Sequence, residues 1–158
     1  LWRHGTYWNV GMRKDELAVM RDARLRDAAE ALDAKLASCT YRTILHGDAK
    51  GANFLFTRGA ERVAAVDFQY PGGGCGVRDV AYLLSGEPDE ARMLDVYFAR
   101  LRDALSPSID GAALEAEWRA LYPIACADFY RFLAGWAPAQ YAHDAHAQRI
   151  VRDVLAGF

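Results

Sequence analysis

Between residues 41 and 67 the sequence loses its helical character, and this short stretch most restricts the fold. The run YRTIL, residues 41–45, has the β-branched and aromatic residues typical of a strand. Two further runs, NFLFT at 53–57 and RVAAVDF at 62–68, flank RGAE, whose glycine favours a turn. We therefore predict a β-hairpin in which residues 53–57 pair antiparallel with residues 63–67.

The sequence on either side of this stretch is helical. Residues 15–37 are rich in alanine, leucine and charged helix formers and predict one helix, and from Asp79 to the last residue the pattern is helical again. Residues 68–78, FQYPGGGCGVR, contain a proline and four glycines and predict an irregular loop. The expected fold is a single mostly helical α+β domain, residues 1–158, with a small β patch.

Composition excludes several classes of protein. The hydrophobic content is 53% and the charged content 25%, which is typical of a globular domain. The formal net charge of −2 gives no basis for nucleic-acid binding. The most apolar segment, residues 121–142, is interrupted by prolines and charges, so we expect no membrane span. Three widely spaced cysteines argue against a disulfide framework, and we predict a cytoplasmic protein.

The predicted hairpin brings polar side chains together. If residues 53–57 pair with 63–67, Asn53 lies opposite Asp67, with Cβ atoms about 5 Å apart on the same face. Asp48 lies on the loop that leads into the first strand. Carboxylate and amide oxygens at one point are ligands that Mg²⁺ prefers, and Mg²⁺ in turn suggests a phosphate-bearing ligand.

The spacing of these residues has a chemical precedent. His-x-Asp followed by Asn, and then a second Asp that starts an Asp-Phe-x triplet after a hairpin, is the pattern of kinase-like phosphotransferases. In that chemistry the first Asp accepts the proton of the attacking hydroxyl, and the Asn and second Asp hold Mg²⁺. The plainer alternative is a turn-forming Asp48 and a capping Asn53. Two motifs in the right order, joined by a hairpin, favour the catalytic interpretation.

The segments LHGDAKGANFLF and VAAVDFQYPGGGCGVRDVAYLL resemble the aminoglycoside phosphotransferase and choline kinase superfamily, which has a protein-kinase-like fold. The triplet ends in Gln rather than Gly, which is closest to the ecdysteroid-kinase-like branch. The resemblance implies a catalytic loop at 46–53, and a metal-binding triplet with a short activation-loop-like segment at 67–79. It implies ATP and Mg²⁺ as cofactors, with Asp48 as the catalytic base and Asn53 and Asp67 as the metal ligands.

The resemblance also implies roles for residues around this centre. His46 would support the catalytic loop from below, and Asp79 would brace it through backbone hydrogen bonds, although an Asp is also favoured as a helix N-cap. Lys50 matches a position where serine/threonine kinases neutralise the transferring phosphate; the alternative is a solvated surface lysine. The C-terminal helices build the acceptor pocket in related kinases. Asp128, Tyr130 and Trp136 are therefore acceptor-site candidates, with structural roles as the alternative for each.

One half of a kinase-like fold has no counterpart in the sequence. No glycine-rich hairpin precedes the HGD motif, and the only lysines are Lys14, Lys35 and Lys50. We therefore expect the chain to be the C-terminal lobe of such a fold, with the N-terminal lobe on sequence not included here. We also expect these 158 residues alone to transfer phosphate poorly.

The predicted function is ATP- and Mg²⁺-dependent phosphotransfer to a hydroxyl of a small molecule. Only 11 residues separate Asp67 from Asp79, which leaves little room to dock a protein substrate, so a protein kinase is disfavoured. A non-catalytic kinase-like module that binds nucleotide or a partner protein is the other alternative. The absent lobe favours that alternative, and the presence of all three motif residues opposes it.

Overall fold

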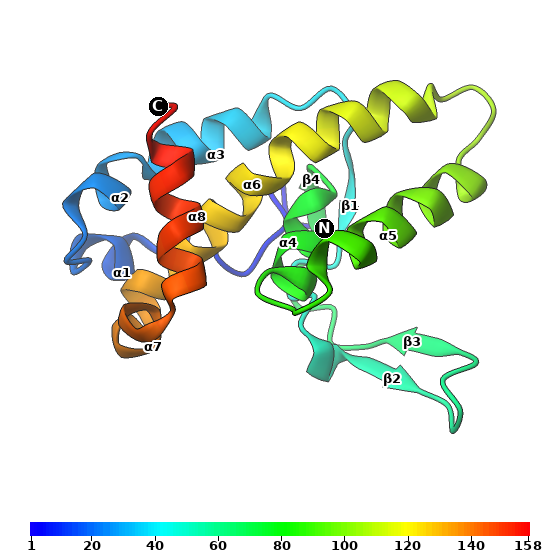
Figure 1. The fold of residues 1–158 in the computed structure, drawn as a ribbon, viewed down its shortest axis with the longest axis horizontal. Helices are drawn as coiled ribbons and strands as arrows, with labels where there is room; N and C mark the ends of the chain where they lie inside the picture. The colour runs from blue at the N-terminus through cyan, green and yellow to red at the C-terminus, as the bar shows by residue number, and fades with distance from the viewer.

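The computed structural model describes residues 1–158 and is mostly helical, as predicted, and it has two small antiparallel sheets where one β patch was expected (Figure 1). Four three-residue strands and a 3₁₀ turn lie between the third and fourth helices. The strands and the turn are β1 (Thr43–Leu45), η1 (Gly51–Asn53), β2 (Phe54–Phe56), β3 (Val63–Ala65) and β4 (Gly72–Gly74). The helices are α1 (Lys14–Ala18), α2 (Ala23–Asp27), α3 (Ala29–Ala37), α4 (Val77–Leu84), α5 (Glu90–Ala104), α6 (Gly111–Trp136), α7 (Pro138–His143) and α8 (Ala145–Leu155).

Helix α6 is the centre of the fold. It has 26 residues and begins at Gly111. The preceding residue, Asp110, is its N-cap, and the Asp110 carboxylate accepts hydrogen bonds from the backbone N–H groups of Ala112 and Ala113. Helices α3, α4, α7 and α8 pack against it, and Figure 1 shows it running through the middle of the helical body. None of the helices has the length and apolar character needed to cross a bilayer.

The helix predicted over residues 15–37 is wrong: this stretch forms three short helices. After α1 the chain turns, and Asp22 caps α2 by accepting a hydrogen bond from the backbone N–H of Leu25. The turn allows both Met20 and Leu25 to reach the core, where they are 3% and 0% exposed. Burial of these side chains outweighs the helix propensity of the intervening residues, because propensity differs by less than about 1 kcal/mol per residue.

The glycine-rich segment is also more regular than predicted, because residues 72–74 form β4, which pairs antiparallel with β1. The backbone of the N-terminal segment lies directly against this strand. A Cβ atom added to Gly72 would lie 2.5 Å from the carbonyl oxygen of Trp2 and 2.6 Å from the backbone nitrogen of Gly5. The glycine is thus needed for a close approach of two backbones, not for a flexible loop.

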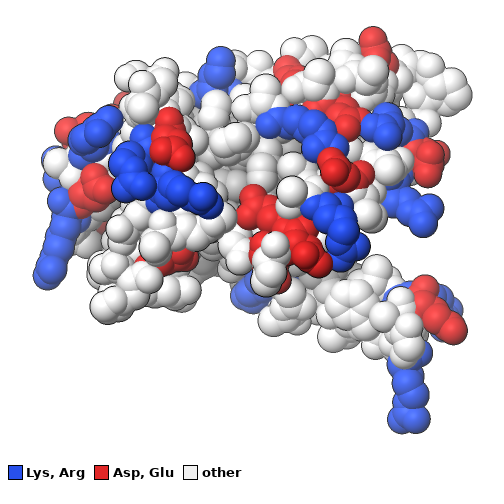
Figure 2. Space-filling view, in the orientation of Figure 1, with Lys and Arg blue, Asp and Glu red and all other residues white.

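The predicted hairpin exists, but its register differs by one residue. Phe54 pairs with Ala65, so Asn53 lies opposite Val66 and not opposite Asp67. The backbone N–H of Val66 donates to the carbonyl oxygen of Asn53 at 2.9 Å. The hairpin projects from the helical body in Figure 1, and Figure 2 shows it mostly uncharged except at its tip.

A buried ion network joins the N-terminal segment to α3, α4 and α6. Asp128 on α6 lies 2.9 Å from Nε of Arg131 and 3.6 Å from a terminal nitrogen of Arg78. Arg78 also pairs with Asp33 on α3, and Arg131 donates to the carbonyl oxygen of Trp8 at 2.7 Å. Asp128 is fully buried, so its charge depends on both arginines for compensation.

We expect Gly72→Ala to destabilise the protein by about 1–3 kcal/mol, since the new methyl group has two backbones to displace. Urea unfolding measures this. Gly51→Ala is the matched control, because nothing lies within 4 Å of a Cβ atom there, and it should change stability by less than about 1 kcal/mol. Equal effects of the two substitutions would contradict the close approach.

We expect Asp128→Ala to cost about 3–5 kcal/mol, because it leaves the buried Arg131 and Arg78 without their shared carboxylate. The control is Asp89→Ala, which breaks an exposed pair with Arg92 and should cost less than about 1 kcal/mol. Thermal unfolding of the two variants side by side is the measurement. A small effect at Asp128 would show that the network is not a stabilising element.

Candidate active site

The loop that carries the HGD motif is held by one half-buried carboxylate. Asp79, in the first turn of α4, accepts hydrogen bonds from the backbone N–H groups of His46 at 2.6 Å and Gly47 at 3.1 Å. Burial raises the pKa of Asp79 above its ordinary value, and these two hydrogen bonds only partly oppose the shift. Asp79 therefore contacts the loop in the way that the sequence comparison predicts for a bracing acid.

His46 connects the same loop to the base of the hairpin. Its Nε2 lies 2.8 Å from the carbonyl oxygen of Val66, and its Nδ1 accepts a hydrogen bond from the backbone N–H of Asp48 at 3.3 Å. This pair of contacts requires a neutral ring with the proton on Nε2. The ring also packs on Phe68, with centroids 4.4 Å apart. His46 thus fixes the position of the loop relative to Asp67, which follows Val66 directly.

Asp48 is nearly buried, at 6% exposed, and both of its protein donors bind one oxygen. Its Oδ2 accepts from Nζ of Lys50 at 2.8 Å and from Nδ2 of Asn53 at 3.0 Å. The same Asn53 nitrogen donates to the backbone carbonyl of Asp48 at 2.8 Å. The hydrogen bond that Lys50 donates to Asp48 raises the pKa of the lysine, so it keeps its positive charge beside the carboxylate. Oδ1 takes part in none of these bonds, and the Tyr82 phenol lies beside the carboxylate.

Asp48, Lys50 and Asp67 line one cavity of about 310 Å³. Most of its other lining residues are aromatic and come from the N-terminal segment, the segment after β3, α4 and the C-terminal half of α6. These are Tyr7, Tyr70, Tyr82, Phe129, Phe132 and Trp136. The guanidinium of Arg13 lies 4.0 Å from the ring centroid of Tyr7, so one face of this aromatic cluster already carries a cation.

Larger cavities exist elsewhere, including an apolar one of about 820 Å³ between the hairpin and helices α4 and α5. Asp48 and Asp67 do not line it. The smaller cavity is the candidate active site because it is the one that combines both carboxylates with Lys50.

The predicted metal ligands are only partly gathered. Asp67 lines the cavity and has no ion-pair partner. Asn53 does not line the cavity, and it donates a hydrogen bond to Asp48, which does. No cluster of three or more His, Cys, Asp or Glu side chains is arranged to hold a metal ion. The groups that could bind a cation here are the Asp67 carboxylate and the Oδ1 atom of Asn53, because the amide directs its nitrogen toward Asp48. Such a pair suits Mg²⁺, which keeps several waters or phosphate oxygens among its ligands.

The three acceptor-site candidates have different surroundings. Trp136 lines the cavity and stacks on Phe132, with centroids 5.6 Å apart. Asp128 belongs to the buried ion network, and the hydroxyl of Tyr130 accepts a hydrogen bond from Ser85 at 2.7 Å. Neither Asp128 nor Tyr130 lines the cavity, so the geometry favours a structural role for each of them.

Sequence analysis did not identify the tyrosines of the cavity. Tyr7 and Tyr70 are far apart in sequence, yet their rings meet edge to face with centroids 5.2 Å apart. Tyr82 lies beside Asp48, and burial followed by the charge of that carboxylate raises the pKa of its phenol. The one available signal was the position of Tyr82, three residues after Asp79 in a predicted helix, which places the two residues on neighbouring faces.

Comparison with known proteins supports the same chemistry. The model of the phosphotransferase enzyme family (APH) matches residues 1–124, which include Asp48, Asn53, Asp67 and Asp79. No curated protein and no solved structure matches the chain. Because the family match covers well over half of the 158 residues, the protein belongs to the phosphotransferase enzyme family.

Proposed function

We propose that the protein transfers the terminal phosphoryl group of ATP to a hydroxyl of a small molecule in a Mg²⁺-dependent reaction. The observation that carries this proposal is the surroundings of Asp48. Lys50 and Asn53 hold one of its oxygens and leave the other free, in the cavity that Asp67 also lines. The protein-kinase-like C-terminal lobe and the assignment to the ecdysteroid-kinase-like branch are parts of the same proposal.

Asp48 is proposed to orient the acceptor hydroxyl and to take its proton. As the acceptor oxygen forms its bond to phosphorus, the bond between phosphorus and the ADP oxygen breaks, and the hydroxyl proton passes to the Asp48 carboxylate. The donors on Oδ2 keep the carboxylate from rotating, so the free oxygen stays fixed toward the hydroxyl. The Lys50 ammonium adds a positive charge close to the transferring group.

Asn53 and Asp67 are the residues proposed to hold the metal ion. A bound Mg²⁺ would offset the negative charge that develops on the phosphate oxygens during transfer. His46 supports this arrangement because it bonds the carbonyl of Val66 and so links the loop of Asp48 to the residue that precedes Asp67. Asp67 itself adopts a positive φ of 64°, a conformation that Asp tolerates better than most residues.

The acceptor is proposed to be a small cationic alcohol. Six aromatic side chains and two carboxylates surround the cavity, and aromatic faces together with acids bind ammonium groups favourably. The volume of about 310 Å³ suits a compact ligand rather than a peptide segment. A protein substrate is correspondingly disfavoured.

The nucleotide-binding lobe is proposed to lie on sequence outside these 158 residues, since no glycine-rich strand with a paired lysine was found. The same feature favours the second candidate function, a non-catalytic module with a kinase-like shape. Activity of the full-length parent protein separates the two, and the predictions below apply to that protein.

We expect Asp48→Asn to lower kcat by a factor of about 10²–10⁴, because the amide cannot accept the hydroxyl proton while its shape preserves the local packing. ADP production in the presence of Mg²⁺ and an accepted alcohol is the readout. Asp103→Asn, at an exposed position on α5, is the control and should leave the rate unchanged. Wild-type turnover in the Asp48→Asn protein would contradict the role of Asp48 as the catalytic base.

We expect Trp136→Ala to weaken a preference for cationic acceptors. Choline and its neutral isostere 3,3-dimethylbutan-1-ol differ mainly in charge, so the ratio of their kcat/KM values isolates the cation–π contribution. Loss of one aromatic face should reduce this ratio by a factor of about 2–30, and Trp136→Phe should retain most of it. Trp136 is 55% exposed, so the substitution should not unfold the protein. If both alcohols are phosphorylated equally well by the wild type, the acceptor proposal fails while the phosphotransferase proposal stands.

A further inference from the structure

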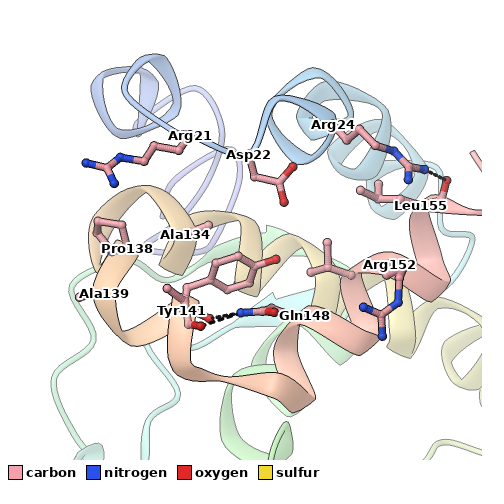
Figure 3. Close-up of a pocket in the computed structure, with 12 residues that line it drawn as sticks. Arg21, Asp22, Arg24, Ala134, Pro138, Ala139, Tyr141, Gln148, Arg152 and Leu155 are labelled. Carbon is pink, nitrogen blue, oxygen red and sulfur yellow. Dashed lines mark hydrogen bonds between the residues drawn. The ribbon is translucent and has the colours of Figure 1, made fainter.

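A second cavity, of about 650 Å³, lies between α2, the C-terminal end of α6, α7 and α8 (Figure 3). It shares no lining residue with the cavity that contains Asp48. The last turns of α6 separate the two: Leu133 and Trp136 face the candidate active site, whereas Ala134 faces the second cavity. Its volume is within the range of small-molecule sites.

The floor of this second cavity is apolar. Ala134, Val151 and Leu155 are buried core residues, and Pro138 and the ring of Tyr141 extend the apolar surface. Burial raises the pKa of Tyr141 to about 12, so its hydroxyl remains a proton donor at neutral pH. Gln148 is already engaged, because its Nε2 donates to the carbonyl oxygens of Tyr141 and Ala142 at 3.1 and 2.9 Å.

The rim is strongly basic. Arg21, Arg24 and Arg152 line the cavity, and none of them forms an ion pair with an Asp or Glu side chain. Figure 2 shows Lys and Arg side chains gathered over α2 and α8 on this face. In Figure 3, Arg24 and Arg152 lie at one end of the cavity, with Leu155 between them, and Arg21 lies at the other end near Pro138. Arg24 donates to the Leu155 carbonyl at 3.3 Å.

The lining contains one carboxylate. Asp22 is the N-cap of α2, and its Oδ1 accepts from the backbone N–H of Leu25 at 3.1 Å. Three arginines and one aspartate give the lining a net charge of +2, on a chain whose net charge is −2. The local charge is therefore opposite in sign to that of the whole protein, which favours a small anion over an extended polyanion.

We propose that this cavity binds a small organic anion, a phosphate or carboxylate attached to an apolar group. The apolar group would cover the floor formed by Ala134, Val151 and Leu155. The anionic group would bind the guanidinium groups at the rim, whose planar arrays of N–H donors match phosphate and carboxylate oxygens. A ligand with both an anionic and an apolar group can contact the rim and the floor together. A free inorganic anion would contact only the rim, and an uncharged apolar ligand only the floor.

Phenyl phosphate is a suitable probe, and calorimetric titration of the protein measures its Kd. We expect it to bind at least ten times more tightly than either inorganic phosphate or benzyl alcohol, because it uses rim and floor together. The double substitution Arg24→Gln, Arg152→Gln should weaken the binding of phenyl phosphate at least tenfold, since it removes two charged hydrogen-bond donors. Arg100→Gln, at an exposed position on α5, should leave the Kd unchanged.

Two further variants keep the test decisive. Arg24→Lys, Arg152→Lys retains the charge without the planar donors, and binding intermediate between the wild type and the glutamine variant is expected. Asp48→Asn should bind phenyl phosphate as the wild type does, which locates the site away from the acceptor cavity. The proposal is overturned if phenyl phosphate does not bind, or if its Kd is the same in the wild type and the glutamine variant.

Discussion

The candidate active site depends on the two hydrogen bonds that Asp79 accepts from the backbone of His46 and Gly47. From this point a continuous set of contacts leads through the His46 ring to Val66, then to Asn53, and back to Asp48. Because the pKa of Asp79 is raised, its ionised form is less favourable in the folded protein than in the unfolded chain. The free energy of unfolding therefore falls as the pH rises from the ordinary pKa of Asp to the raised one. A half-buried carboxylate whose ionised form opposes stability is better explained by the loop geometry that it maintains than by a stabilising role.

Helix α6 combines three environments along its length. Its first half packs on the core through Leu114 and Trp118, and its middle holds Asp128 within the ion network. Its C-terminal end forms a wall between an aromatic, acidic cavity and an apolar cavity with a basic rim. Because the end of this helix separates two cavities whose charged lining residues differ in sign, each cavity could bind its own class of ligand.

Local patterns predicted which motif residues lie near each other better than they predicted the surrounding helices and strands. The motif spacing identified Asp48 and Asp67, and these residues do line one cavity, because the hairpin that joins them is a short-range structure. The break of residues 15–37 into three helices depends on core positions for Met20 and Leu25 that no local pattern specifies. The strand at Gly72 depends on contact with Trp2 and Gly5, and such long-range backbone contacts are not encoded in the composition of either segment.

The one-residue register difference changes how Asp67 reaches the site. In the predicted register, Asn53 and Asp67 would lie directly opposite each other, and strand alternation would place both side chains on the same face. The ladder instead continues to Val66, whose N–H bonds Asn53, and Asp67 follows it with a φ of 64°. A non-glycine residue in that region carries a conformational cost of about 1 kcal/mol or more, which the surrounding structure must offset. The hydrogen bond from His46 to the Val66 carbonyl is well placed to do so, because it fixes the peptide that precedes the turn. The position of Asp67 thus depends on a histidine from the loop that carries Asp48, and not on strand pairing alone.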